Sequence, residues 1–171
     1  AAARALAAQG VACTVLDAHA EPGAQASGNP AGLFHGTVGR DDTLHTRWFR
    51  AASFEAAAWV RSAPQAGAAD GLLRLNEEID IDAMRALLEA QALPPAYLQA
   101  LDAAQASSRA GLELRRPAWL FSAGGWADPR ALIRAALALP GDTWRGSTAV
   151  GAIEPFADGS RLRDRAGSPI A

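Results

Sequence analysis

The segment from Ala26 to Phe34 holds the residues whose types and spacing are best suited to contact a ligand. It reads Ala-Ser-Gly-Asn-Pro-Ala-Gly-Leu-Phe. Small residues let a backbone approach a ligand closely, and Ser27 and Asn29 add short polar groups that can donate or accept hydrogen bonds. An ordinary surface loop has a similar composition. The composition of this segment therefore leaves both a ligand-binding loop and a plain surface loop open.

Asp17 is a further candidate for a ligand contact, because it directly follows the apolar run 11–16. A helix-favouring stretch at 1–9 precedes that run, and Gly10 is suited to end the helix. Helix, glycine, buried strand and terminal acid form the second half of a Rossmann βαβ unit. In that unit the acid accepts hydrogen bonds from the adenosine ribose of a dinucleotide. Any α/β protein with a strand that ends in Asp shows the same pattern.

The composition excludes several classes of protein. The 171 residues are 50% hydrophobic and 20% charged, with a formal net charge of −2 and a pI near 5.9. This chain is too apolar to be disordered, and it lacks the positive excess of a basic nucleic-acid module. All 16 residues counted as Lys or Arg are arginine, so no lysine of this chain can form a Schiff base.

Other kinds of site are also absent from the sequence. Cys13 is the single cysteine, which excludes an intrachain disulfide. The three histidines, His19, His35 and His45, lack the spacing of metal ligands, so no metal site is expected. The sequence contains no run of about 18 apolar residues, so no membrane span is expected. No side chain is a convincing general base, and the catalytic residues are left unassigned.

The remaining sequence alternates between predicted helices and strands. Helical spacing predicts helices at 43–62, 81–91, 95–105 and 129–139. Capping residues support three of them: Asp41, Asp42 and Thr43 are candidates for the first, Asp80 or Asp82 for the second and Asp128 for the last, while Pro95 is suited to open the remaining one. Strands are predicted at 71–76, at 119–122 and around two turns between 144 and 170. The stretch 18–39 is expected to be a loop.

The Ala26–Phe34 segment and its surroundings resemble a known family. Residues 25–63 are similar to the flavin-dependent oxidoreductase domain of the bifunctional tRNA 5-methylaminomethyl-2-thiouridine biosynthesis proteins, within the D-amino-acid-oxidase-like flavoproteins. The shared pattern is Ala-Ser-Gly-Asn, Gly32, Phe34, an Asp-containing turn and a helix. The similarity resumes at 124–132, which resembles the family element Gly-Gly-Trp-x-x-Pro-x-x-Leu, and it extends loosely through Val150 and the later turns.

The resemblance implies FAD as the cofactor and assigns residues to it. Asp17 would meet the FAD ribose, and the backbone of Val150 would approach the adenine. The residues that would line the stretch from the pyrophosphate to the isoalloxazine are Ala26, Ser27, Gly28, Asn29, Gly32 and Leu33. His35 departs from the aromatic residue expected after this motif, which weakens the case for a flavin contact there.

The implied fold is α/β, with a partial Rossmann-like FAD-binding layer and part of an inserted α+β substrate domain. We expect residues 1–66 and 124–171 to belong to the FAD-binding layer and residues 67–123 to the substrate domain. The sequence contains no Gly-x-Gly-x-x-Gly turn. We therefore expect an internal portion of a larger flavoprotein, which alone would not bind FAD measurably because the turn that binds the pyrophosphate is missing.

The resemblance also implies a reaction, in which the flavin removes a hydride from the carbon beside an amine and the resulting imine hydrolyses. In the family this converts 5-carboxymethylaminomethyl-uridine of tRNA to the aminomethyl form. The expected partner is tRNA, with a fused methyltransferase domain and a cytoplasmic location. One alternative is a flavin oxidase of a small free amine such as glycine or sarcosine. A second alternative is a truncated remnant without catalytic activity.

Overall fold

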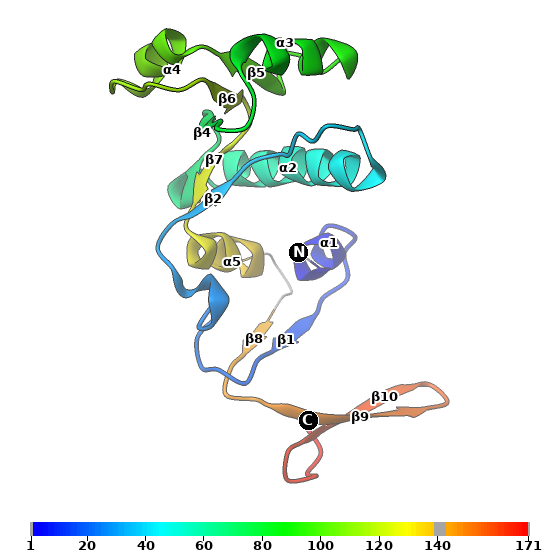
Figure 1. Ribbon diagram of the computed structural model, residues 1–171. Helices are drawn as coiled ribbons and strands as arrows, with labels where there is room; N and C mark the ends of the chain where they lie inside the picture. The colour runs from blue at the N-terminus through cyan, green and yellow to red at the C-terminus, as the bar shows by residue number, and fades with distance from the viewer. Residues whose placement is uncertain (1, 139–142, 171) are drawn as a thin grey trace. The chain divides into compact units, whose positions relative to one another are not determined.

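The structure is a computed structural model that describes residues 2–138 and 143–170 (Figure 1). The chain divides into two compact units. The terminal unit comprises residues 1–30 and 128–171, and the central unit comprises residues 31–127. The assignment of 1–66 and 124–171 to a cofactor layer and of 67–123 to a substrate domain stays a prediction.

The terminal unit is built on a pair of parallel strands. Its elements are α1 (Ala2–Ala7), β1 (Thr14–Leu16), the 3₁₀ helix η1 (Ala26–Gly28), α5 (Pro129–Leu137), β8 (Thr143–Arg145), β9 (Val150–Phe156) and β10 (Gly159–Asp164). Strand β1 pairs in parallel with β8, with Val15 opposite Trp144. Parallel pairing in a unit that also contains helices agrees with the predicted α/β fold class.

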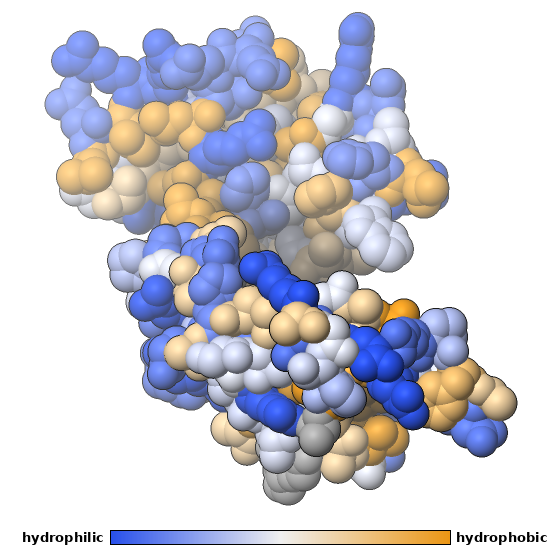
Figure 2. Space-filling view, turned by 90° about the horizontal axis from the view of Figure 1, so that it is seen from below, coloured by the Kyte–Doolittle hydropathy of each residue, from blue (hydrophilic) through white to orange (hydrophobic). Residues whose placement is uncertain are grey.

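Strands β9 and β10 form an antiparallel hairpin that is largely exposed. On it, Arg163 Nε donates to Glu154 at 2.7 Å, and the Arg161 guanidinium lies over the ring of Phe156. Figure 2 views the molecule from the side of this hairpin and shows hydrophobic and hydrophilic residues interspersed. The alternating arginines of β10 are thus partly engaged by partners on β9 and do not form a purely basic strip.

The central unit contains two small antiparallel sheets and three α-helices. Its elements are β2 (Gly32–Phe34), α2 (Leu44–Ser62), η2 (Pro64–Ala66), β3 (Gly67–Ala68), β4 (Leu72–Leu75), α3 (Ile81–Ala90), β5 (Leu98–Leu101), α4 (Ala103–Ala110), β6 (Ala118–Phe121) and β7 (Gly125–Ala127). One sheet has the order β2-β7-β3 and the other β4-β6-β5. Strand β6 is the middle strand of its sheet and is buried along its whole length, with Trp119 and Phe121 in the core cluster.

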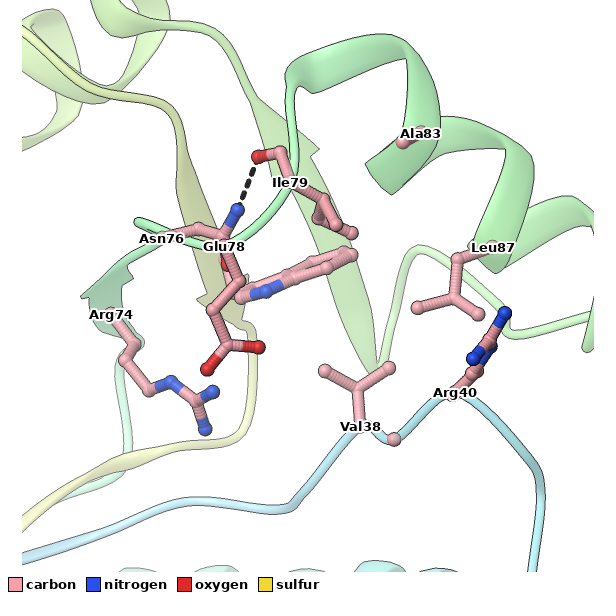
Figure 3. Close-up of a pocket in the computed structure, with 10 residues that line it drawn as sticks. Val38, Arg40, Arg74, Asn76, Glu78, Ile79, Ala83 and Leu87 are labelled. Atoms are coloured by element: carbon pink, nitrogen blue, oxygen red, sulfur yellow. Dashed lines mark hydrogen bonds between the residues drawn. The ribbon is translucent and has the colours of Figure 1, made fainter.

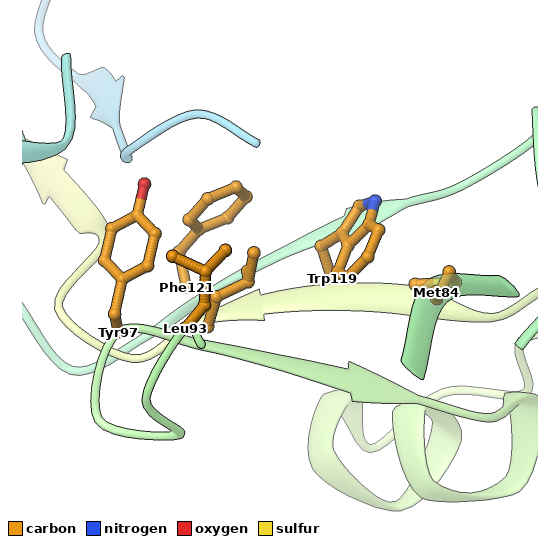
Figure 4. Close-up of a cluster of buried hydrophobic side chains, with 6 residues drawn as sticks. Met84, Leu93, Tyr97, Trp119 and Phe121 are labelled. Atoms are coloured by element: carbon orange, nitrogen blue, oxygen red, sulfur yellow. The ribbon is translucent and has the colours of Figure 1, made fainter. Parts of the chain in front are cut away.

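The hydrophobic core of the central unit lies where α3 and the loop before β5 pack on β6 (Figure 4). The buried residues of this cluster are Met84, Leu93, Tyr97, Leu98, Trp119 and Phe121. The Tyr97 hydroxyl donates to the carbonyl of Thr37 at 2.8 Å, which satisfies the one polar group of a ring that is 2% exposed. This core fixes the loop after β2 to the β4-β6-β5 sheet.

The helix caps agree with the sequence except at one place. Thr43, Asp80 and Asp128, each one of the predicted candidates, accept a backbone hydrogen bond at the start of a helix. The predicted helix at 95–105 is wrong. Leu98 instead begins β5, opposite Phe121 of β6, and Asp102 opens α4 through a capping box with Gln105.

Two further expectations differ from the structure, and one predicted helix end is not tested. The first predicted strand begins at Thr14 and not at Val11, whose side chain is 48% exposed. The expected loop at 18–39 contains η1 and β2. Helix α5 is described through Leu137, and its predicted end at Leu139 lies outside the described residues.

Candidate functional site

Asp17 lies directly after β1, at the carboxyl end of the parallel strand. Its Oδ1 atom accepts a hydrogen bond from the backbone N–H of His19 at 2.7 Å and lies 3.0 Å from the ring Nδ1 of the same residue. The backbone hydrogen bond is the main cause that holds the pKa of Asp17 below its usual value, and the imidazole contact adds to it. With 40% of its side chain exposed, Asp17 is an ionised acceptor open to hydroxyl donors.

His19 joins this acid to the loop that follows. The Nε2 atom of its ring lies 2.7 Å from the side-chain nitrogen of Gln25, which is a hydrogen-bond donor. His19 Nε2 must therefore accept, which leaves the ring proton on Nδ1, facing Asp17. Gln25 in turn accepts from Gly28 N–H through its carbonyl at 2.8 Å and so closes the η1 turn. A continuous chain of hydrogen bonds thus runs from Asp17 to the Ala26–Gly28 turn.

The segment after β8 packs on the other side of Asp17. The N–H of Thr148 donates to the carbonyl of Asp17 at 2.7 Å, and the N–H of Ser147 donates to the carbonyl of His19 at 3.0 Å. A side chain at Gly146 would place its Cβ 2.3 Å from the carbonyl of Ala20, so only glycine fits there. The backbones of 17–20 and 145–148 are therefore in direct contact. Val150, which begins β9, follows two residues after this contact.

Arg130 on α5 holds the loop that carries Ser27 and Asn29. Its Nε donates to the carbonyl of Gly23 at 3.2 Å. A Cβ on Gly23 would lie 3.1 Å from Arg130 Cγ, and one on Gly28 would lie 3.1 Å from Arg130 Nη2. Gly23 also has a φ of +72°, which favours glycine. Two glycines therefore allow the loop to lie against the first turn of α5.

Ser27 and Asn29 are the polar members of this loop. Ser27 is part of η1 and half-buried, and Asn29 is exposed with an extended backbone. Within residues 2–138 and 143–170, neither side chain makes a hydrogen bond. Both side chains are thus available to a ligand, as are the small neighbours Ala26 and Gly28.

Gly32 and Leu33 belong to the central unit, where β2 pairs with β7. Leu33 is 76% exposed and lines a pocket of about 480 Å³ together with Phe34, His35 and residues of α2. The ring of His35 packs at 4.8 Å from that of Phe121, and its Nδ1 contacts the carbonyl of Gly36. This pocket has the apolar and aromatic lining that a planar ring system requires.

These features fit an FAD molecule in two respects. Asp17 is an exposed, ionised acceptor of the kind that binds ribose hydroxyls, and the glycine-lined loop offers unpaired polar groups and an accessible backbone. In the described residues, no group of three or more His, Cys, Asp or Glu side chains could hold a metal ion. Among the same residues, no helix is both long and apolar enough to cross a membrane.

The parallel β1–β8 pair with an acid at its carboxyl end is the arrangement found in α/β dinucleotide-binding proteins. A family model described as "FAD dependent oxidoreductase" (DAO) matches residues 1–167. The chain therefore belongs to the DAO family of FAD-dependent oxidoreductases, and FAD is its cofactor.

Curated relatives extend this result. The chain is 42% identical over its whole length to a protein of Methylibium petroleiphilum named tRNA 5-methylaminomethyl-2-thiouridine biosynthesis bifunctional protein MnmC, of which it covers 27%. It is 35% identical to the protein of the same name from Thiobacillus denitrificans, again over its whole length and 28% of that protein. The chain thus spans about a quarter of the curated relatives that it matches.

Solved structures show the same fold. Glycine oxidase from Geobacillus kaustophilus matches 96% of the chain, with a TM-score of 0.67 and 19% identity, and the chain covers 48% of it. Iminodiacetate oxidase from Chelativorans sp. BNC1 matches 99% of the chain, with a TM-score of 0.67 and 20% identity, and the chain covers 49% of it. At this identity the likeness concerns the fold, and it confirms the predicted architecture.

Sequence reasoning missed His19 and Arg130 as parts of the site. The spacing of the histidines bears only on a metal site, although an Asp two residues before His19 is the spacing at which a carboxylate caps a turn. No sequence signal indicates Arg130, because its contacts with Gly23 and Gly28 join segments about a hundred residues apart. The roles of Asp17, Ala26, Ser27, Gly28, Asn29, Gly32, Leu33 and Val150 toward FAD stay predictions.

Proposed function

We propose that this chain is part of an enzyme that oxidises a C–N bond with FAD and removes the carboxymethyl group from 5-carboxymethylaminomethyl-uridine of tRNA. The proposed substrate rests on the 42% identity, over the whole chain, to a protein named for the biosynthesis of 5-methylaminomethyl-2-thiouridine in tRNA. On this proposal the partner is tRNA, the full-length protein carries a fused methyltransferase domain, and the enzyme acts in the cytoplasm.

The residues of this chain would bind and orient the cofactor. Asp17 would accept hydrogen bonds from the ribose as a carboxylate, whose pKa lies below its usual value. Ser27 and Asn29 would contact the stretch between pyrophosphate and ring, with Ala26, Gly28 and Gly32 leaving room for it. Leu33 would form an apolar wall, and the backbone of Val150 would approach the adenine. Bound FAD supplies the acceptor for the hydride of the amine carbon.

A flavin oxidase of a free amine is the second candidate. The observation that favours it is the likeness in fold to glycine oxidase and iminodiacetate oxidase. One fold serves many substrates in such families, so this observation weighs less than the closer sequence similarity. A remnant without catalytic activity is the third candidate.

Two measurements on the protein, expressed with whatever residues flank this chain in its gene, separate the three candidates. We expect the purified protein to carry close to one FAD per chain, as measured by its visible absorbance. Protein that lacks FAD even after FAD is added would support the remnant. Nucleoside mass spectrometry of tRNA incubated with the enzyme should show loss of the carboxymethyl group. Unchanged tRNA together with oxidation of glycine or sarcosine would favour the free-amine oxidase.

A further inference from the structure

A second pocket of the central unit, separate in its lining from the Leu33 pocket, has charged residues at both ends. Its volume is about 500 Å³, and it lies between the loop after β2 and the turn from β4 to α3 (Figure 3). Arg74 and Glu78 lie on one side, Arg40 lies on the other side beside Leu87, and Val38 and Ile79 line the space between them.

A buried amide, Asn76, and a half-buried one, Gln91, fix the walls of this pocket. Asn76 is 7% exposed, and its side-chain nitrogen donates to the carbonyl of Ile79, which shapes the turn that bears Glu78. Gln91, at the end of α3, donates to the carbonyls of Gly39 at 2.8 Å and Arg40 at 3.1 Å. The two charged ends are therefore held by separate anchors, and the pocket is formed before any ligand enters.

The charges in this pocket lack partners. Across residues 2–138 and 143–170, the side chains of Arg40, Arg74 and Glu78 make no ion pair or hydrogen bond. Other arginines of the same unit do make ion pairs, such as Arg50 with Asp42 and Arg116 with Glu77. The pocket thus offers unpaired donors at one end, and a donor beside an acceptor at the other end.

This arrangement selects the class of ligand. An anion alone would satisfy Arg40 but would be repelled by Glu78 if it filled the pocket. The pocket volume of about 500 Å³ suits a ligand of about drug size, and glycine would fill only a small part of it. A nucleotide has an anionic phosphate, a flat apolar ring and a base edge that presents both donors and acceptors. Its parts match the order of groups along the pocket.

We propose that this pocket binds a nucleotide, with the phosphate at Arg40, the base between Val38 and Ile79, and the base edge at Glu78 and Arg74. The inference rests on the proposed function only for the source of the ligand, which is then a nucleotide of the RNA substrate. Arginine suits the phosphate because its planar guanidinium donates two parallel hydrogen bonds. Glu78 accepts from amino or imino groups of the base, and Arg74 donates to its carbonyl or ring nitrogen.

The test is equilibrium binding of AMP, GMP, CMP, UMP and inorganic phosphate to the full-length protein, measured by titration calorimetry. At least one nucleotide should bind tenfold or more tightly than inorganic phosphate. Arg40→Gln should weaken that nucleotide about tenfold, and Glu78→Gln should change the preference among the four bases. Arg115→Gln is the matched control, because Arg115 is an exposed arginine of the same unit outside the pocket. It should leave the affinity unchanged.

Nucleotides that bind no better than inorganic phosphate would overturn the proposal, as would equal losses in Arg40→Gln and Arg115→Gln. Unmodified tRNA should displace the bound nucleotide, and failure to displace it would contradict RNA as the source. None of these measurements needs flavin turnover. Loss of the nucleotide site and loss of the oxidation of tRNA are therefore separate results, and either proposal can fail while the other stands.

Discussion

The imidazole Nδ1 atom of His19 lies 3.0 Å from Oδ1 of Asp17, and both residues lie just after the parallel strand β1. Through Gln25, the same imidazole also reaches the turn that carries Ser27. The acid expected to bind the ribose and the loop expected to bind the next part of the cofactor are thus parts of one hydrogen-bonded network. This relationship predicts that changes at Asp17 and in the loop affect the same ligand.

The low pKa of Asp17 predicts that stability depends on pH. The carboxylate is favoured in the folded state, so its contribution to the free energy of unfolding is present above the usual Asp value of 3.8 and is lost as the pH falls below it. Urea unfolding between pH 6 and pH 3 should show this loss. Asp17→Asn should flatten the slope without abolishing it, because the pKa of Glu154 is also lowered, by its hydrogen bond from Arg163. An identical slope in Asp17→Asn would contradict the account.

The double variant Ser27→Ala/Asn29→Ala should weaken FAD binding by about 1–3 kcal/mol, the scale for the loss of buried hydrogen bonds. The expectation follows from the two unpaired polar groups of the glycine-flanked loop. Titration calorimetry of the full-length protein with FAD measures the effect. Ser108→Ala, at an exposed position of α4, is the control and should leave FAD affinity unchanged. Equal affinities in all three proteins would remove this loop from the cofactor site.

Gly23 and Gly10 form a matched pair for the cost of a side chain in the loop. Both have a positive φ, of +72° and +76°, and alanine at either should cost about 1–2 kcal/mol of stability from backbone strain. Only Gly23 is also crowded, by Arg130 and Ile133, whereas nothing lies within 4 Å of a Cβ on Gly10. Gly23→Ala should therefore lose more stability in urea than Gly10→Ala. A larger loss at Gly10 would show that Arg130 does not pack on the loop.

Much of the secondary structure can be predicted from the sequence, because the interactions that begin and end its elements are local. Thr43, Asp80 and Asp128 cap helices through short-range hydrogen bonds, so the starts of these helices can be predicted. Asp17 likewise indicates the end of β1. The sequence does not predict strand β5, because a proline at the start of an apolar stretch favours a helix. The decisive interactions were the pairing of Leu98 with distant Phe121 and the capping box at Asp102.

The candidate site is predictable to a lesser degree. The motif residues were found from their types and order, but the contacts that hold them were not. Arg130 touches a loop about a hundred residues earlier in the chain, and the pocket between Arg40 and Arg74 joins separate segments. Such contacts depend on tertiary packing, which the spacing of residues in one segment does not encode.

In the core of the central unit, truncating a buried side chain should lower the free energy of unfolding strongly. Met84 of α3 is fully buried in the cluster that includes residues of β5 and β6, so Met84→Ala should lower the free energy of unfolding by about 2–5 kcal/mol. Leu112 is 68% exposed, and Leu112→Ala should change it by less than about 0.5 kcal/mol. Thermal or urea unfolding measures both. Similar losses in the two variants would place Met84 outside the core.

The reduction of the bound flavin under anaerobic conditions tests the proposed function most directly. The full-length protein, loaded with FAD, is mixed in a stopped-flow instrument with tRNA that carries 5-carboxymethylaminomethyl-uridine, or with glycine, sarcosine or D-alanine. The account predicts rapid loss of the oxidised flavin absorbance with this tRNA and negligible loss with the free amines. Rapid reduction by a free amine, with none by the tRNA, would contradict it.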